Sequence, residues 1–175
     1  SITAGTYVNI NQGIGTVDDE TSDGNTVLAK DGDVTLGAYQ GKSIHGNSNS
    51  ITAEQGDIAM SGKILGNENI LTAKAEKDAE GAIVDGGNIS GTSVEGDKNQ
   101  LLADAAITLT GSVKGDENVL NAGTSIAVTG NIEGNKNDLD AGTTISTADI
   151  IGDENTLDAG ESITTAAITG NKNAL

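Results

Sequence analysis

The sequence contains no cysteine, proline, tryptophan, phenylalanine or arginine, and its only aromatic residues are Tyr7 and Tyr39. Without cysteine, disulfides and thiol chemistry are excluded. Without arginine, and with a formal net charge of −17, the chain has no basic patch, which excludes nucleic acids and anionic membrane surfaces as expected partners. No run of 18 apolar residues is present, so no membrane insertion is expected.

What the chain does contain is glycine, at 25 of 175 positions, together with many Val, Ile, Leu and Thr residues. Branched aliphatic residues and threonine are enriched in β-strands. A globular core of ordinary shape is hard to fill without phenylalanine or tryptophan. The apolar residues are therefore expected to pack in an unusually regular way.

One eight-residue pattern recurs: Gly, Asn or Asp, any residue, Asn, any residue, Leu or Ile, any residue, Ala. Complete copies begin at Gly46, Gly66, Gly96, Gly115, Gly134 and Gly152, and a truncated copy begins at Gly170. Successive starting glycines are 20, 30, 19, 19, 18 and 18 residues apart. Repeats of this length are typical of solenoids.

Between the copies, apolar and polar residues alternate again, as in Ile107-Thr108-Leu109. Each repeat thus holds three short segments with the period of a strand, separated by Gly, Asn or Asp turns. Such a unit cannot form a core alone, but stacked units bury continuous columns of aliphatic side chains. The sequence predicts an all-β fold, a right-handed parallel β-helix with three short strands per coil of about 18–20 residues.

Two repeated polar positions indicate stacking in register. The Asn at the fourth position is expected to form a structural column of side-chain amides: Asn49, Asn69, Asn99, Asn118, Asn137, Asn155 and Asn173. The third position alternates in charge from Glu68 onward: Glu68, Lys98, Glu117, Lys136, Glu154 and Lys172, preceded by Ser48. In a parallel stack, opposite charges in neighbouring coils attract, so this order is interpreted as register control.

The pattern is interrupted in two places. The 30-residue spacing after Gly66 indicates a charged loop insertion within residues 74–87, and residues 1–45 are less regular, with an acidic loop at 18–23. Residues 96–175 form the regular shaft. The whole of 1–175 is expected to be one β-helix segment of a longer protein, able to stack end to end.

Catalysis is not expected. His45 is the only histidine and has no recognisable nucleophile partner. Carboxylate pairs such as Asp116-Glu117 and Asp153-Glu154 recur in equivalent positions, whereas a catalytic pair needs a unique environment. The sequence therefore predicts no enzyme, no catalytic residues and no cofactor.

Two further binding functions have partial support. Residues 152–160 superficially resemble the calcium-binding repeat of RTX proteins, but Asn155 stands where that repeat has Asp. Weak calcium binding, and a calcium-stabilised RTX-like domain, stay open without defined ligands. Thr108 and Thr110 suggest the threonine ladder of ice-binding solenoids, but the next coil has Ala127, so the ladder is mixed.

Stretches such as residues 137–145, Asn-Asp-Leu-Asp-Ala-Gly-Thr-Thr-Ile, resemble the β-helical shafts of filamentous-haemagglutinin-like exoproteins of two-partner secretion and of autotransporter passenger domains. The resemblance covers residues 46–175 and implies a secreted, outer-membrane-associated bacterial surface protein. The implied function is a structural shaft that projects a binding or effector region of an adhesin away from the cell. The alternative is that this segment itself binds a host, glycan or bacterial surface partner through its 74–87 loop or a sheet face.

Overall fold

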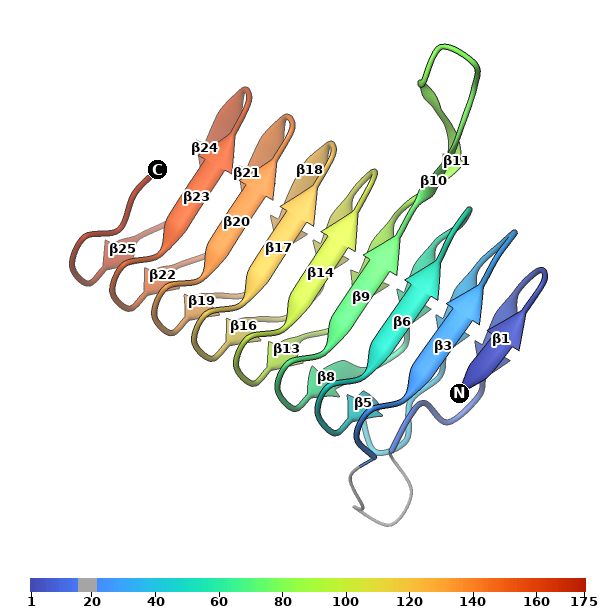
Figure 1. Ribbon diagram of the computed structural model, residues 1–175. Coiled ribbons are helices and arrows are strands. Elements are labelled where there is room, and N and C mark those ends of the chain that lie inside the picture. The colour runs from blue at the N-terminus through green and yellow to red at the C-terminus, as the bar shows by residue number, and fades with distance from the viewer. Residues whose placement is uncertain (16–21) are drawn as a thin grey trace.

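The computed structural model describes residues 1–15 and 22–175, so residues 18–21 of the predicted acidic loop lie outside the described residues. Within those ranges the chain forms 25 strands and no helix. The strands build three parallel sheets that run along the axis of a rod, plus one antiparallel hairpin (Figure 1). The predicted parallel β-helix is confirmed.

Sheet A contains one strand from each of eight coils. In order along the rod these are β1 (Ile2–Ala4), β3 (Thr26–Ala29), β6 (Ser50–Ala53), β9 (Ile70–Ala73), β14 (Gln100–Ala103), β17 (Val119–Ala122), β20 (Asp138–Ala141) and β23 (Thr156–Ala159).

Sheet B is built in the same way, from β2 (Val8–Ile10), β4 (Val34–Leu36), β7 (Ile58–Met60), β12 (Ile89–Gly91), β15 (Ile107–Leu109), β18 (Ser125–Val128), β21 (Thr144–Ser146) and β24 (Ser162–Thr164). Sheet C has seven strands: β5 (Lys42–His45), β8 (Lys63–Leu65), β13 (Val94–Glu95), β16 (Val113–Lys114), β19 (Ile132–Glu133), β22 (Ile150–Ile151) and β25 (Ile168–Thr169).

Each coil follows the same path. In Figure 1 the chain ascends through the front sheet A, crosses to sheet B behind, and returns through sheet C while advancing towards the C-terminus. This winding is right-handed, as expected. Every pairing within the three sheets is parallel, and equivalent positions of the repeat face one another, as Leu101 faces Leu71 and Leu120.

The core is a set of aliphatic columns, because alternate residues of each strand point inward. Sheet A contributes a column of Leu, Ile and Val and a column of alanine, including Leu120 and Ala122, which are 0% and 3% exposed. Sheet C contributes Ile and Val, including Ile64 and Val113. Stacking of equivalent small and medium residues fills the rod, so the core needs no aromatic side chain.

The insertion at residues 74–87 is a hairpin rather than an unstructured loop. Strand β10 (Ala75–Lys77) pairs antiparallel with β11 (Ile83–Gly86), and the hairpin projects from the junction between sheets A and B (Figure 1). The coils on either side remain paired: β9 pairs with β14 at all four positions. The insertion therefore leaves the rod uninterrupted.

The N-terminal region follows the same architecture more closely than its sequence suggests. Coils from residues 1–45 contribute β1 to β5 to the same three sheets, and Ile14 forms an isolated parallel bridge with Ile44. One irregularity among the described residues is the tight turn in which Tyr39 pairs with Lys42. The sequence pattern understated the order here because these coils have degenerate turns.

Candidate functional site

The recurring four-residue turn, from sheet C to sheet A, is the most specialised part of each coil. Its glycine has a φ of +127° to +147° in the seven copies from Gly46 to Gly170, a region that favours glycine. The residue two positions later is also left-handed, with φ between 56° and 60° from Ser48 to Lys172. This backbone brings the second and fourth residues of the turn against the equivalent residues of adjacent coils.

The fourth-position asparagines form a continuous buried ladder. In each step from Asn25 to Asn155 the backbone N–H and the Nδ2 of one asparagine donate to Oδ1 of the asparagine in the next coil, and in the last step the backbone N–H of Asn155 donates to Oδ1 of Asn173. For Asn99 and Asn118 these distances are 3.0 and 3.1 Å. The ladder also includes Asn25, whose N and Nδ2 donate to Oδ1 of Asn49 at 2.9 Å.

The same amides also bond backwards along the rod. Nδ2 of Asn69 donates to the carbonyl oxygen of Gly46 in the preceding coil at 2.9 Å, and to Oδ1 of Asn99 in the following coil at 3.0 Å. Asn155 and Gly134 repeat the backward bond at 2.9 Å. One side chain thus joins three successive coils. Because Asn69 is 0% exposed, each of these bonds satisfies a group that water cannot reach.

A second ladder, which the sequence pattern did not reveal, runs along the exposed second position of the turn. Here Oδ1 of each Asn or Asp accepts the backbone N–H of the next coil, in the opposite sense to the buried ladder. Asp97, Asp116 and Asn135 are joined by bonds of 2.8 and 2.7 Å. The full column is Asp23, Asn47, Asn67, Asp97, Asp116, Asn135, Asp153 and Asn171.

The two ladders explain which residues the sequence has at each position of the turn. The exposed position accepts either Asn or Asp, because only the acceptor Oδ1 is required. The buried position is Asn in every copy, because it needs an acceptor and a donor and cannot hold an unpaired charge. The residue type at the second and the fourth position of the turn therefore reflects how buried that position is and which hydrogen bonds it makes.

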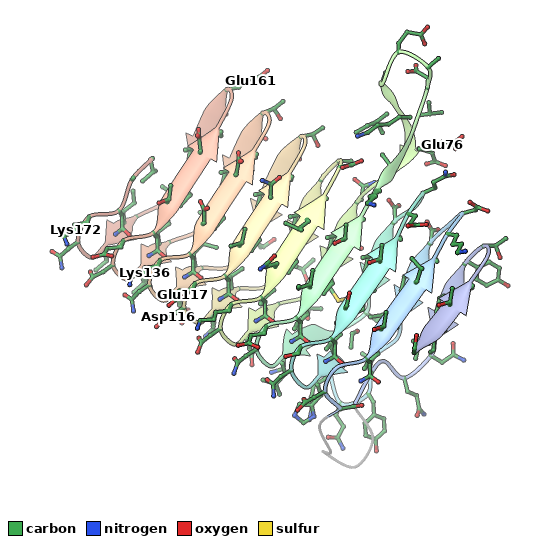
Figure 2. The ribbon with its side chains drawn as sticks, viewed as in Figure 1. Glu76, Asp116, Glu117, Lys136, Glu161 and Lys172 are labelled. Carbon is green, nitrogen blue, oxygen red and sulfur yellow. The ribbon has the colours of Figure 1, made fainter. Side chains whose placement is uncertain are left out.

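The alternating charges at the third position extend into solvent along one corner of the rod, where Figure 2 labels Glu117, Lys136 and Lys172. Lys172 Nζ lies 3.2 Å from Glu154 Oε1, and Ser48 Oγ donates to Glu68 Oε2 at 3.3 Å. Within residues 1–15 and 22–175, the Glu154–Lys172 contact is the ion pair that this column forms. Exposed pairs of this kind contribute about 0.2–1 kcal/mol each.

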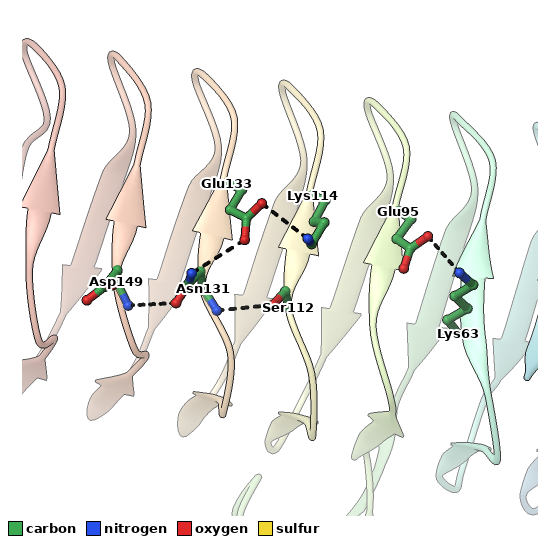
Figure 3. A network of polar contacts seen from close by, with 7 residues as sticks. All are labelled: Lys63, Glu95, Ser112, Lys114, Asn131, Glu133 and Asp149. Carbon is green, nitrogen blue, oxygen red and sulfur yellow. Dashed lines mark hydrogen bonds and ion pairs between the residues drawn. The ribbon is translucent and has the colours of Figure 1, made fainter.

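Two further ion pairs lie on sheet C, and the sequence pattern did not predict them. Lys63 pairs with Glu95 at 2.7 Å, and Lys114 pairs with Glu133 at 3.2 Å (Figure 3). Glu95, Lys114 and Glu133 occupy equivalent positions of successive coils. Each of these residues directly precedes the glycine of a repeat. The alternation of acidic and basic residues at that position could have predicted the Lys114–Glu133 pair.

A shallow groove of about 480 Å³ follows the same corner over the glycines of four coils. Side chains along it include His45, Leu65, Glu95 and Lys114. Nδ1 of His45 lies 3.5 Å from Nζ of Lys42. The groove is open because the turn glycines carry no side chains.

Several carboxylates, including Asp116 and Asp153 of the recurring carboxylate pairs, accept hydrogen bonds within the rod. Oδ1 of Asp57 accepts the backbone N–H and Nδ2 of Asn88 at 2.8 and 3.0 Å, while Asp116 and Asp153 belong to the exposed ladder. No group of three or more His, Asp or Glu side chains is arranged to hold a metal ion in the part of the chain that the structure describes. Nor do those residues form a helix long and apolar enough to cross a membrane.

Comparisons with known proteins returned no matching family model, no matching curated protein and no matching solved structure.

Proposed function

We propose that this chain is a structural shaft of a secreted bacterial surface protein, a rigid spacer that holds a binding or effector region away from the cell. The observation that carries the proposal is the unbroken register of eight coils along sheets A and B. Register persists even past the inserted hairpin, where β6, β9 and β14 pair at all four of their positions.

Rigidity follows from how many interactions a deformation must break together. Separating two coils breaks the backbone bonds of three sheets, opens the aliphatic columns, and disrupts both turn ladders. A single hydrogen bond contributes only about 0.5–1.5 kcal/mol net, but these bonds share one interface and open together. Eight coils at about 4.8 Å each give a rod roughly 38 Å long.

The acidic surface suits a secreted spacer that must stay soluble. Exposed carboxylates lie on the turn corner and on the outer face of sheet A near the C-terminus, where Asp138, Asp140 and Asp158 face outward. Like charges on these surfaces repel a neighbouring shaft. The partner of the complete protein is expected to be a host-cell or bacterial surface molecule.

The proposal predicts that folding needs no metal. A far-UV circular dichroism melt in EDTA and one in excess calcium should give the same β spectrum and the same cooperative transition, because the ladders join protein groups to each other. A chain that is disordered in EDTA and becomes β only with calcium would contradict this and favour the calcium-stabilised repeat domain.

A second candidate function, binding through the insertion, is supported by the β10–β11 hairpin. Both of its strands are edge strands, and Ile83 and Val84 are 41% and 61% exposed. Its base is attached to the rod, where Lys77 Nζ lies 2.9 Å from Asp104 Oδ2. An exposed hairpin with apolar side chains is suited to pairing with an extended peptide that adds a strand to its edge.

Deleting Ala75–Gly86 separates the two candidates. This deletion leaves three residues between Ala73 and Ile89, the number that the next coil has between Ala103 and Ile107. We expect a melting temperature within a few degrees of the parent, because the coil regains the length of its neighbour. Adhesion of the surface-displayed protein should be unchanged if the chain is a spacer, whereas loss of adhesion with intact folding would favour the hairpin.

A further inference from the structure

The β10–β11 hairpin contains the longest run of exposed residues in the described part of the chain. All ten residues from Glu76 to Asp85 are exposed. The hairpin stands clear of the rod (Figure 1), and its two strands form a separate sheet whose register shifts between Glu76 and Lys77. Opening the hairpin therefore leaves every pairing of the three parallel sheets intact.

The tip of the hairpin is a short turn held by one carboxylate. Oδ1 of Asp78 accepts the backbone N–H groups of Glu80 and Ala82 at 3.1 and 2.8 Å. The backbone N–H of Asp78 donates to the carbonyl oxygen of Ala82 at 3.0 Å, and Gly81 between them has a φ of +86°. Exposed loop tips made of small and polar residues are preferred sites of proteolytic cleavage.

Exposed charged residues also occur at the third position of the recurring turns, but there the backbone is bonded to the next coil. The N–H of Glu117 donates to the carbonyl oxygen of Asn135 at 2.9 Å, and the N–H of Glu154 donates to that of Asn171 at 2.9 Å. The two glutamates have left-handed φ angles of 58° and 60°. An endopeptidase binds its substrate as an extended strand, so these turns become substrates only when neighbouring coils separate.

We propose that the tip of the hairpin, residues 78–82, is a cleavage site for an endopeptidase, and that the two resulting chains stay assembled as one rod. The reaction is hydrolysis of one peptide bond. The C–N bond breaks, water supplies the hydroxyl of the new carboxyl group, and its proton goes to the new amine. Both new termini lie in the exposed hairpin, so neither charge has to be buried.

The two chains would share a complete interface between coils. Across the cut, β9 pairs with β14, β7 with β12, and β8 with β13. The backbone N–H and Nδ2 of Asn69 both donate to Oδ1 of Asn99 at 3.0 Å, which continues the buried ladder. Nζ of Lys63 lies 2.7 Å from Oε2 of Glu95. All of these contacts lie outside the hairpin, so cleavage of its tip breaks none of them.

Partial digestion of the native chain with a glutamate-specific endopeptidase tests the site. The bond after Glu80 should be cut at least about tenfold faster than the bonds after Glu68, Glu117 and Glu154, which are exposed turn residues of the same type. Mass spectrometry of the fragments gives these rates, with the urea-unfolded chain as the control for sequence preference. Equal rates in the native chain, or no cut after Glu80 while the unfolded chain is cut there, would overturn the proposal.

Assembly of the cut chain is tested by gel filtration and by melting. Residues 1–80 and 81–175 should elute together in native buffer and separate in denaturant. Because unfolding of the cut rod releases two chains, its melting temperature should rise by about 5–10 °C between about 1 µM and about 100 µM protein. The melting temperature of the uncut chain should not change. Fragments that separate in native buffer would overturn the proposal.

Asp78→Ala tests whether the turn at the tip controls access. Loss of the carboxylate that holds the turn should speed cutting after Glu80 at least about threefold, because the hairpin opens more often. The melting temperature should stay within about 2 °C of the parent, since no contact between coils is lost. A rate that does not change would contradict the role of the tip. Cleavage is read from fragment masses, so its outcome does not depend on whether the chain is a spacer or binds through the hairpin.

Discussion

Replacing Gly115 by alanine is expected to lower the free energy of unfolding by about 3–5 kcal/mol. Gly115 has a φ of +127°, and a Cβ at this position would overlap the carbonyl oxygen of Gly96 and lie 2.8 Å from Oδ1 of Asp97. The backbone of the adjacent coil cannot move away without breaking the exposed ladder. The melting temperature should fall by roughly 10 °C, measured by circular dichroism.

Two other glycines separate the causes of this loss. Gly24 has a φ of +67°, but a Cβ added there would have no atom within 4 Å, so Gly24→Ala should cost only backbone strain, about 1 kcal/mol. Gly5 has open space and no positive φ, so Gly5→Ala should change stability by less than about 0.5 kcal/mol. A Gly115 variant as stable as the Gly5 variant would contradict the close approach of successive turns.

Replacing Asn118 by alanine is expected to cost about 3–5 kcal/mol. Asn118 is 0% exposed, and its Oδ1 accepts from both the N–H and Nδ2 of Asn99. Its Nδ2 donates to Oδ1 of Asn137 at 3.1 Å. The variant leaves the buried backbone N–H of Asn99 without a partner and leaves its Nδ2 with only the carbonyl oxygen of Gly66, and each unsatisfied buried group costs about 1–3 kcal/mol.

A reciprocal pair of substitutions tests the roles of the two ladders by chemical denaturation. Asn118→Asp keeps the acceptor but loses the donor and buries a carboxylate, so it should be destabilised at neutral pH at least as strongly as the alanine variant. Asp116→Asn keeps the exposed acceptor that bonds Asn135, so it should change stability by less than about 0.5 kcal/mol. Equal effects from these two changes would contradict the assignment of a buried and an exposed ladder.

The fold could be predicted from the sequence because the repeat shows which residues occupy equivalent positions in successive coils. Residues such as Leu101, Leu120 and Leu139 occupy the same place in copies 19 residues apart, and only stacked coils make that periodicity useful. The column of fourth-position asparagines followed from the same argument. The hairpin did not, because residues 74–87 have no counterpart in other coils and no clear strand alternation.

The interactions of the charged side chains could be predicted from the sequence only in part. The alternation from Glu68 to Lys172 was evident, but the one ion pair that it forms within residues 1–15 and 22–175 joins Glu154 and Lys172. An ion pair between two exposed side chains contributes little to stability. The alternation of Glu and Lys in the sequence therefore did not produce an ion pair at every step of the column. The Lys63–Glu95 pair joins residues 32 positions apart in non-equivalent places of the repeat, which periodicity does not reveal.

The sequence by itself determined the solenoid, its coil length, its aliphatic columns and its buried asparagine column, because each of these is a property of the period. Tertiary structure alone decided which hydrogen-bond direction each ladder takes, which charges pair, and how the insertion is built. Each of these depends on where the turns place the side chains in space, which the period of the sequence does not specify.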